Sequence, residues 1–194
     1  MKPVILLVHG INATDKGRRS MRPLQQKLVA EGCDARIVYY GLVLLPTTNI
    51  TAVRKLQTTI KPFNEEGRPV IVCGYSNGGW AAVQAAETGL KIDHLVLVSP
   101  TLHKRHAIPE GVKSAHVFYS RGDYVLHFAR FRRWLRKKIP CISKPHGWGE
   151  MGRVGYEGND RRVTNHTMDR SVRHWWYKDT ASVTKVASVI KQLK

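Results

Sequence analysis

Short apolar runs alternate with longer amphipathic segments along this chain. Val4 to Val8 and Val70 to Cys73 are continuously apolar, which is typical of strands buried on both faces. Ser20 to Gly32 repeats its apolar residues at helical spacing, with a serine to cap its start and a glycine to end it. The same alternation predicts further strands at 35–40, 94–98, 115–120 and 162–168, and further helices at 50–63, 79–88, 124–138 and 180–194.

Strands that alternate with helices form a mostly parallel central sheet flanked by helices on both faces, which is an α/β fold. We expect one domain over residues 1–194, because the chain contains no repeat and no linker. Residues 141–160 are rich in glycine, proline and aromatic side chains, which predicts loops or a hairpin. In such sheets functional residues gather at the carboxyl ends of the strands.

One of these strand ends carries Gly74-Tyr75-Ser76-Asn77-Gly78, between a predicted strand and a predicted helix. A serine on so sharp a turn presents its hydroxyl above the sheet, and the crowded backbone requires glycine on both sides. A glycine-rich turn that contains a serine by chance is the alternative. The strand before and the helix after the motif favour a nucleophilic serine.

Two other strand ends carry groups that could activate a serine. Asp123 follows the strand at 115–120, although Gly-Asp is also a common turn pair. Asp93 precedes its strand and Asp160 lies in a predicted loop, so both are weaker candidates. His166 lies within the predicted last strand, and His174 follows it in a segment rich in aromatic residues.

The order of serine, aspartate and histidine resembles that of the α/β-hydrolases over nearly the whole chain. The motifs that carry the resemblance are a His9-Gly10 loop after the first strand, the glycine-serine turn, and Gly122-Asp123 after a strand. The resemblance implies a compact serine esterase or small lipase, without the first strands of the full fold and without a large lid.

The family's functional groups can be carried over to matching positions. The resemblance implies a catalytic triad of Ser76, Asp123 and His174, with His166 as the alternative base, because small lipase-like hydrolases carry a histidine followed by aromatics before the last helix. The backbone N–H groups of Ile11 and Asn77 would form the oxyanion hole. Such chemistry uses no cofactor and no metal.

The chain is strongly basic, because 32 Lys and Arg against 14 Asp and Glu give a net charge of +18. A field of this sign attracts anionic partners. The densest basic cluster lies in the predicted helix Tyr124–Lys138, which is either a solvated basic face or a surface for an anionic membrane or another polyanion. The sequence contains no specific nucleic-acid-binding motif.

The function that the family resemblance favours is hydrolysis of a small-molecule or lipid ester through an acyl-enzyme. The same fold acting on an amide, a thioester or a polymer ester stays open, as does a polyanion- or nucleic-acid-binding module on a hydrolase-like scaffold. Three widely spaced cysteines suggest neither a zinc site nor a disulfide framework. The apolar start is too short for a signal peptide and no stretch could cross a membrane, so we expect a cytoplasmic protein.

Overall fold

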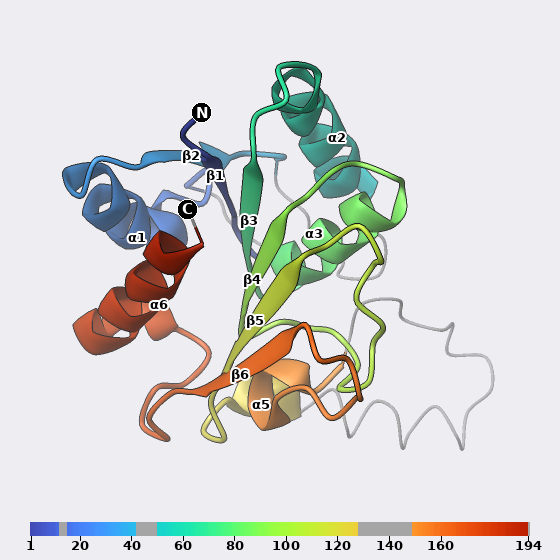
Figure 1. The fold of residues 1–194 in the computed structure, drawn as a ribbon. Coiled ribbons are helices and arrows are strands. Elements are labelled where there is room, and N and C mark those ends of the chain that lie inside the picture. The colour runs from blue at the N-terminus through green and yellow to red at the C-terminus, as the bar shows by residue number, and fades with distance from the viewer. Residues whose placement is uncertain (12–14, 42–49, 128–148, 194) are drawn as a thin grey trace.

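Six parallel strands form one sheet at the centre of the molecule (Figure 1). The computed structural model describes residues 1–11, 15–41, 50–127 and 149–193. The strands are β1 Val4–Val8, β2 Asp34–Val38, β3 Val70–Tyr75, β4 His94–Val98, β5 Ser114–Tyr119 and β6 Val163–Thr167. They lie in the order β2-β1-β3-β4-β5-β6, and every neighbouring pair is parallel.

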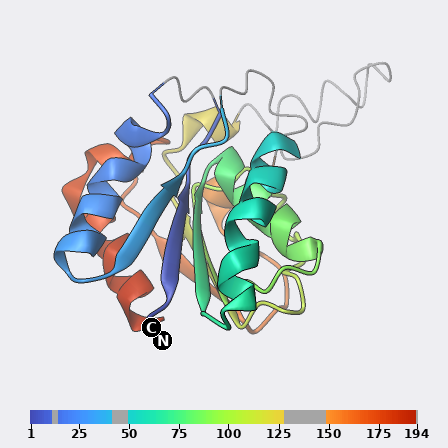
Figure 2. The same ribbon diagram turned by 90° about the horizontal axis from the view of Figure 1, so that it is seen from above.

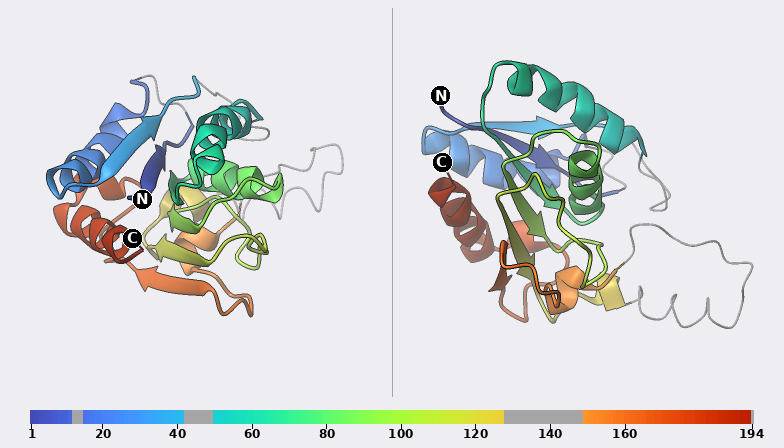
Figure 3. Two further views of the ribbon diagram at one scale, coloured as in Figure 1. Left: turned by 45° about the horizontal axis from the view of Figure 1, so that its top comes forward. Right: turned by 45° about the vertical axis from the view of Figure 1, so that its right-hand side comes forward.

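Helices cover both faces of this sheet, as Figure 2 shows from above. On one face lie α1 Arg18–Ala30, the short 3-10 helix η1 Trp176–Lys178 and α6 Thr180–Gln192. On the other lie α2 Ile50–Glu65, α3 Asn77–Glu87 and the single-turn helix α5 Met151–Val154. The predicted α/β fold class is confirmed. Figure 3 shows that the two chain ends lie near each other.

The strand β1 explains why helices cover both faces of the sheet. All five of its residues are buried. Because successive side chains of a strand point to opposite faces, Leu6 packs in the cluster under α2 and α3, while Ile5 and Leu7 pack in the cluster under α1 and α6. Each such side chain stabilises the fold by about 1.5–3 kcal/mol relative to an exposed position.

The sheet has two edge strands, β2 and β6, and both carry polar side chains. β2 carries Asp34 and Arg36, which form an ion pair with each other. On β6, the amide side chain of Asn165 accepts a hydrogen bond from the Tyr156 N–H (2.8 Å) and donates one to the Tyr156 carbonyl (2.9 Å). The segment around Tyr156 is thereby tied to β6.

Some element boundaries differ from those that the sequence predicts. Helix α1 begins at Arg18 rather than at Ser20, because the Asp15 carboxylate accepts hydrogen bonds from the backbone N–H groups of Gly17 and Arg19. Of the loops or hairpin predicted at 141–160, residues 141–148 lie outside the described residues, and within 149–160 the structure has the short helix α5 and no hairpin.

The predicted basic helix Tyr124–Lys138 is helical from Tyr124 to His127, and the remainder of it lies outside the described residues. Over the part of the chain that the structure describes, no helix combines the length and the apolar character needed to span a bilayer.

Candidate active site

Ser76 alone makes the turn between β3 and α3. Its backbone angles are φ 55° and ψ −122°, a conformation that residues other than glycine rarely adopt. The turn is held by the Ser76 N–H, which donates to the Val98 carbonyl of β4 (2.9 Å), and by the Ser76 carbonyl, which accepts from the Gly79 N–H (3.0 Å). The neighbouring strand and the new helix thus fix the strained serine from both sides.

Two glycines allow this turn to sit close to the rest of the sheet. A Cβ atom on Gly78 would lie 2.4 Å from the carbonyl oxygens of both Val8 and His9. A Cβ atom on Gly74 would lie 2.6 Å from the Gly78 carbonyl oxygen. Neither position has room for a side chain, which is the physical reason for the Gly-x-Ser-x-Gly spacing.

The structure joins three of the predicted side chains by hydrogen bonds. His174 Nε2 lies 3.0 Å from Ser76 Oγ, and His174 Nδ1 lies 2.8 Å from Asp123 Oδ2. The Asp123 side chain is fully buried, and its Oδ1 accepts the Leu126 N–H (3.2 Å). With the proton on Nδ1, the imidazole donates to Asp123 and leaves Nε2 to accept the serine hydroxyl.

His174 reaches the serine from the loop between β6 and η1, and Tyr75 helps to hold it there. The Tyr75 hydroxyl donates to the His174 carbonyl (3.0 Å), and the two rings lie 5.2 Å apart. Burial raises the pKa of Tyr75 well above its usual value, so its phenol stays protonated and remains a donor. Sequence reasoning assigned no role to Tyr75, because only the folded chain brings this loop onto the residue before Ser76.

His166, the alternative base, lies elsewhere. Its ring stacks on Phe118 with centroids 4.5 Å apart, and its Nε2 lies 3.0 Å from Nδ1 of His116. The Ser114 hydroxyl lies 3.2 Å from His116 Nε2 and 2.8 Å from His94 Nδ1, so these polar groups cross three neighbouring strands. Burial, and then the neighbouring imidazoles, lower the pKa of His116 to about 4.

The two other aspartates that the sequence offered have structural partners. Asp93 accepts the Val70 N–H (2.8 Å) and pairs with Lys113 (2.8 Å) at the amino end of the sheet. Asp160 pairs with Arg162 (2.6 Å). Of the candidate acids, Asp123 is therefore the one that the structure places against an imidazole beside Ser76.

The loop after β1 packs directly against Ser76. A Cβ atom on Gly10 would lie 3.2 Å from Ser76 Cβ, and Ile11 follows it in the chain. His9 Nδ1–H donates to the Gly10 carbonyl (2.7 Å), and the His9 ring stacks on Tyr40 with centroids 4.1 Å apart. The Tyr40 hydroxyl lies 2.7 Å from the carbonyl oxygens of both His9 and Gly10.

His9 is neutral in this setting, because burial lowers the pKa of its imidazole. An uncharged ring that donates to the next carbonyl fixes the backbone of the loop. Asn77 follows Ser76 directly as the first residue of α3, and Ile11 follows Gly10, the residue that packs against Ser76.

Comparisons with known proteins agree with this fold. A structure from Xanthomonas campestris assigned to the α/β-hydrolase superfamily is 14% identical and covers 98% of this chain and 99% of its own, with a TM-score of 0.59. An α/β serine hydrolase without a lid from the same organism is 12% identical, covers 99% and 83%, and has a TM-score of 0.60. A cutinase-like protein from Cryptococcus is 12% identical, covers 99% and 95%, and has a TM-score of 0.58.

Sequence comparisons find less. No family model matches the chain. A curated protein named tRNA pseudouridine synthase A, from Lawsonia intracellularis, is 26% identical over an alignment of 129 residues that covers 62% of this chain and 48% of that protein. The match thus spans about half the length of that relative. The structural likeness is the more extensive one, and the chain has the fold of the α/β-hydrolase superfamily.

Proposed function

We propose that this protein is a serine hydrolase that cleaves carboxylic esters, with Ser76 as nucleophile, His174 as base and Asp123 as its partner. The observation that carries the proposal is the hydrogen-bond chain from Ser76 Oγ through the imidazole to the buried carboxylate. Structural neighbours described as a serine hydrolase without a lid, an esterase domain and a cutinase-like protein support it.

The proposed reaction begins with attack of Ser76 Oγ on the ester carbonyl carbon, while His174 Nε2 takes the hydroxyl proton. Asp123 stabilises the imidazolium that results. The tetrahedral intermediate collapses, and Nε2 returns the proton to the departing alcohol to leave an acyl-enzyme. Water then attacks the acyl carbon with the same base, which releases the acid and restores the serine.

We propose the backbone N–H groups of Ile11 and Asn77 as donors to the oxyanion. Asn77 is the residue after Ser76, and Ile11 follows Gly10, whose carbonyl is held by His9 and Tyr40, so that the N–H of Ile11 would be fixed before reaction. Donors that are fixed before reaction stabilise developing charge without reorganisation, and each one is worth about 3 kcal/mol of transition-state stabilisation.

The decisive test combines covalent labelling with ester turnover. A fluorophosphonate probe should label the native protein and fail to label Ser76→Ala. His174→Ala should lose turnover of a chromogenic ester by several orders of magnitude, whereas His166→Ala, the matched control, should keep it. Unchanged ester turnover in Ser76→Ala would refute the proposed hydrolase function. If His166→Ala loses ester turnover and His174→Ala keeps it, His166 is the base.

A second candidate function is the binding of RNA or another polyanion. It rests on the net charge of +18 and on the partial likeness to a protein whose name refers to tRNA. A fluorescence-anisotropy titration with an RNA oligonucleotide at rising salt tests it, because phosphate contacts make affinity fall steeply with salt. Absence of saturable binding at low salt would remove this candidate.

A further inference from the structure

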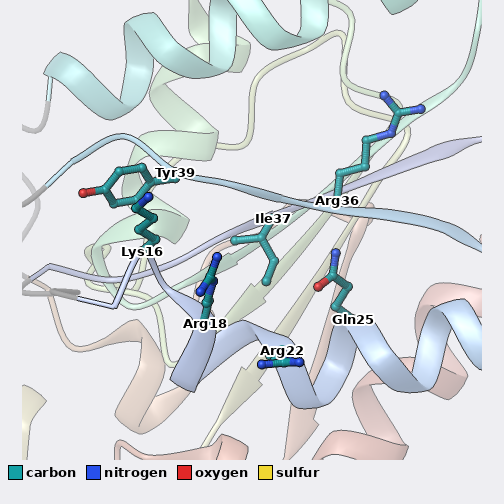
Figure 4. A pocket seen from close by; sticks show the side chains of 7 residues that line it. All are labelled: Lys16, Arg18, Arg22, Gln25, Arg36, Ile37 and Tyr39. Carbon is teal, nitrogen blue, oxygen red and sulfur yellow. The ribbon is translucent and has the colours of Figure 1, made fainter.

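A hollow of about 670 Å³ lies between α1 and the edge strand β2. Its size is within the range of pockets for small molecules. It is formed by the loop before α1, the first turns of α1, and β2 with the residue that follows it (Figure 4). The lining residues are Lys16, Arg18, Arg22, Gln25, Arg36, Ile37 and Tyr39.

Three of the cations in this hollow, Lys16, Arg18 and Arg22, are exposed and form no ion pair within the described part of the chain. Arg36 differs, because its guanidinium binds both carboxylate oxygens of Asp34 and points away from Arg18 and Arg22 (Figure 4). Asp15, the acid next to Lys16 in sequence, is not part of the lining and is engaged by the backbone at the start of α1. The hollow therefore carries three cations that form no ion pair within the described residues, and Asp15 is the acid next to them in sequence.

The other lining residues form the walls of the hollow around these cations. The Gln25 amide donates to the Ala35 carbonyl (3.1 Å), which joins α1 to β2 beneath the hollow. The Lys16 ammonium lies 5.9 Å from the centre of the half-exposed Tyr39 ring, a cation–π contact that draws it toward this wall. Ile37 adds an apolar patch between the cations. A concave wall with a few convergent charged groups is the pattern of a small-molecule site.

Arg18 and Arg22 stand one turn apart on α1, so their guanidinium groups can act on the same ligand. Like charges at this spacing repel each other when the hollow is empty. A ligand with two or more negative charges would turn that repulsion into attraction. The guanidinium fork matches the paired oxygens of a phosphate, which favours phosphate over a single carboxylate.

We propose that this hollow binds a small compound that carries two or more phosphate charges. The proposal is independent of the hydrolase function, because none of the lining residues belongs to the hydrogen-bond chain at Ser76. The Tyr39 ring connects the hollow to the loop beside Ser76, because its centroid is 5.9 Å from that of His9. The phosphates could be those of a free metabolite or those of a lipid headgroup, and the two sources present the same chemistry.

Calorimetric titration with sodium tripolyphosphate at about 0.1 M salt tests the site. The native protein should bind one equivalent, and the affinity should fall sharply at about 1 M salt, where the Debye length shrinks to about 3 Å. Arg18→Gln with Arg22→Gln should weaken binding by at least about tenfold, since each guanidinium makes charge-assisted hydrogen bonds. Far-UV circular dichroism establishes that the variant is folded.

Arg54→Gln with Lys55→Gln is the matched control, because it removes two exposed cations from α2 on the opposite face of the sheet. It should change the affinity by less than about twofold. Equal weakening in both double variants would reduce the binding to net charge and overturn the site, as would no binding by the native protein.

Vesicles that contain a phosphorylated phosphoinositide distinguish the two sources of phosphate. Retention of the native protein on these vesicles, and its loss in the Arg18 and Arg22 double variant, would assign the site to a headgroup. Tripolyphosphate binding without vesicle binding would assign it to a free compound. If an RNA oligonucleotide binds through these arginines and tripolyphosphate does not, the small-ligand proposal is wrong.

Discussion

Replacement of Gly78 by alanine should destabilise the whole protein. The added Cβ atom would lie 2.4 Å from the carbonyl oxygens of Val8 and His9, whereas ordinary contacts begin at 3.4 Å. Both atoms belong to backbone at the end of the fully buried strand β1, so neither can swing away as a side chain would. The start of α3 and the end of β1 must therefore separate by about 1 Å, inside a close-packed interior.

Overpacking of this kind costs about 1–3 kcal/mol, and two backbone contacts place the cost in the upper half of that range. A loss of about 2 kcal/mol lowers the melting temperature of a chain of this length by roughly 4–8 °C. Gly111→Ala is the matched control, because a Cβ atom there meets nothing within 4 Å.

Urea unfolding followed by circular dichroism measures both variants. The reasoning is refuted if Gly78→Ala and Gly111→Ala have the same midpoint of unfolding. Ester turnover by Gly78→Ala should also fall, since the shift moves the His9-Gly10 backbone relative to Ser76.

Three further changes give separate tests. Tyr75→Phe removes the hydrogen bond to the His174 carbonyl, so it should lower the free energy of unfolding by about 1–3 kcal/mol and reduce kcat; unchanged values in urea unfolding and the ester assay would contradict this. The pKa of His116 is about 4 in the folded chain against 6.5 in a free imidazole, so stability present above pH 6.5 should be lost as the pH falls toward 4. Solvent screening of this half-buried ring limits the loss to about 1 kcal/mol, and His116→Gln should flatten the pH profile of thermal unfolding. Glutamine at Arg132, Arg133, Arg136 and Lys137 should weaken co-sedimentation with anionic vesicles at low salt and leave hydrolysis of a neutral ester unchanged. Equal sedimentation of the variant and the native protein would show that this segment does not bind the vesicles.

The sequence predicted the sheet and the strained turn because both depend on local pattern. An apolar run such as Val70 to Cys73 requires burial on both faces, and Gly-x-Ser-x-Gly between a strand and a helix has few other geometries. The helix α5 escaped prediction, because a single turn has too few residues to show a period.

Features that depend on distant segments could not be predicted in this way. Tyr75 and His174 are 99 residues apart in sequence, and nothing in the order of residues indicates that they bond. Sequence left His166 and His174 as alternatives, because one lies within the last predicted strand and the other follows it. The register of β5 and β6 places His166 opposite Phe118, on which its ring stacks. The basic hollow likewise exists only when α1 packs on β2.

The polar edges of the sheet bear on how this chain avoids self-association. An edge strand offers a row of unpaired N–H and C=O groups to a second copy of the same sheet. At β2, Asp34 and Arg36 place charges beside that row, and a docking copy would have to desolvate them. At β6, the Lys185 ammonium donates to the Thr167 carbonyl (2.7 Å) and so places a charge at the end of this strand. Addition of a seventh strand from another molecule is therefore disfavoured at both edges of the sheet, because a docking strand would have to desolvate charged groups at each.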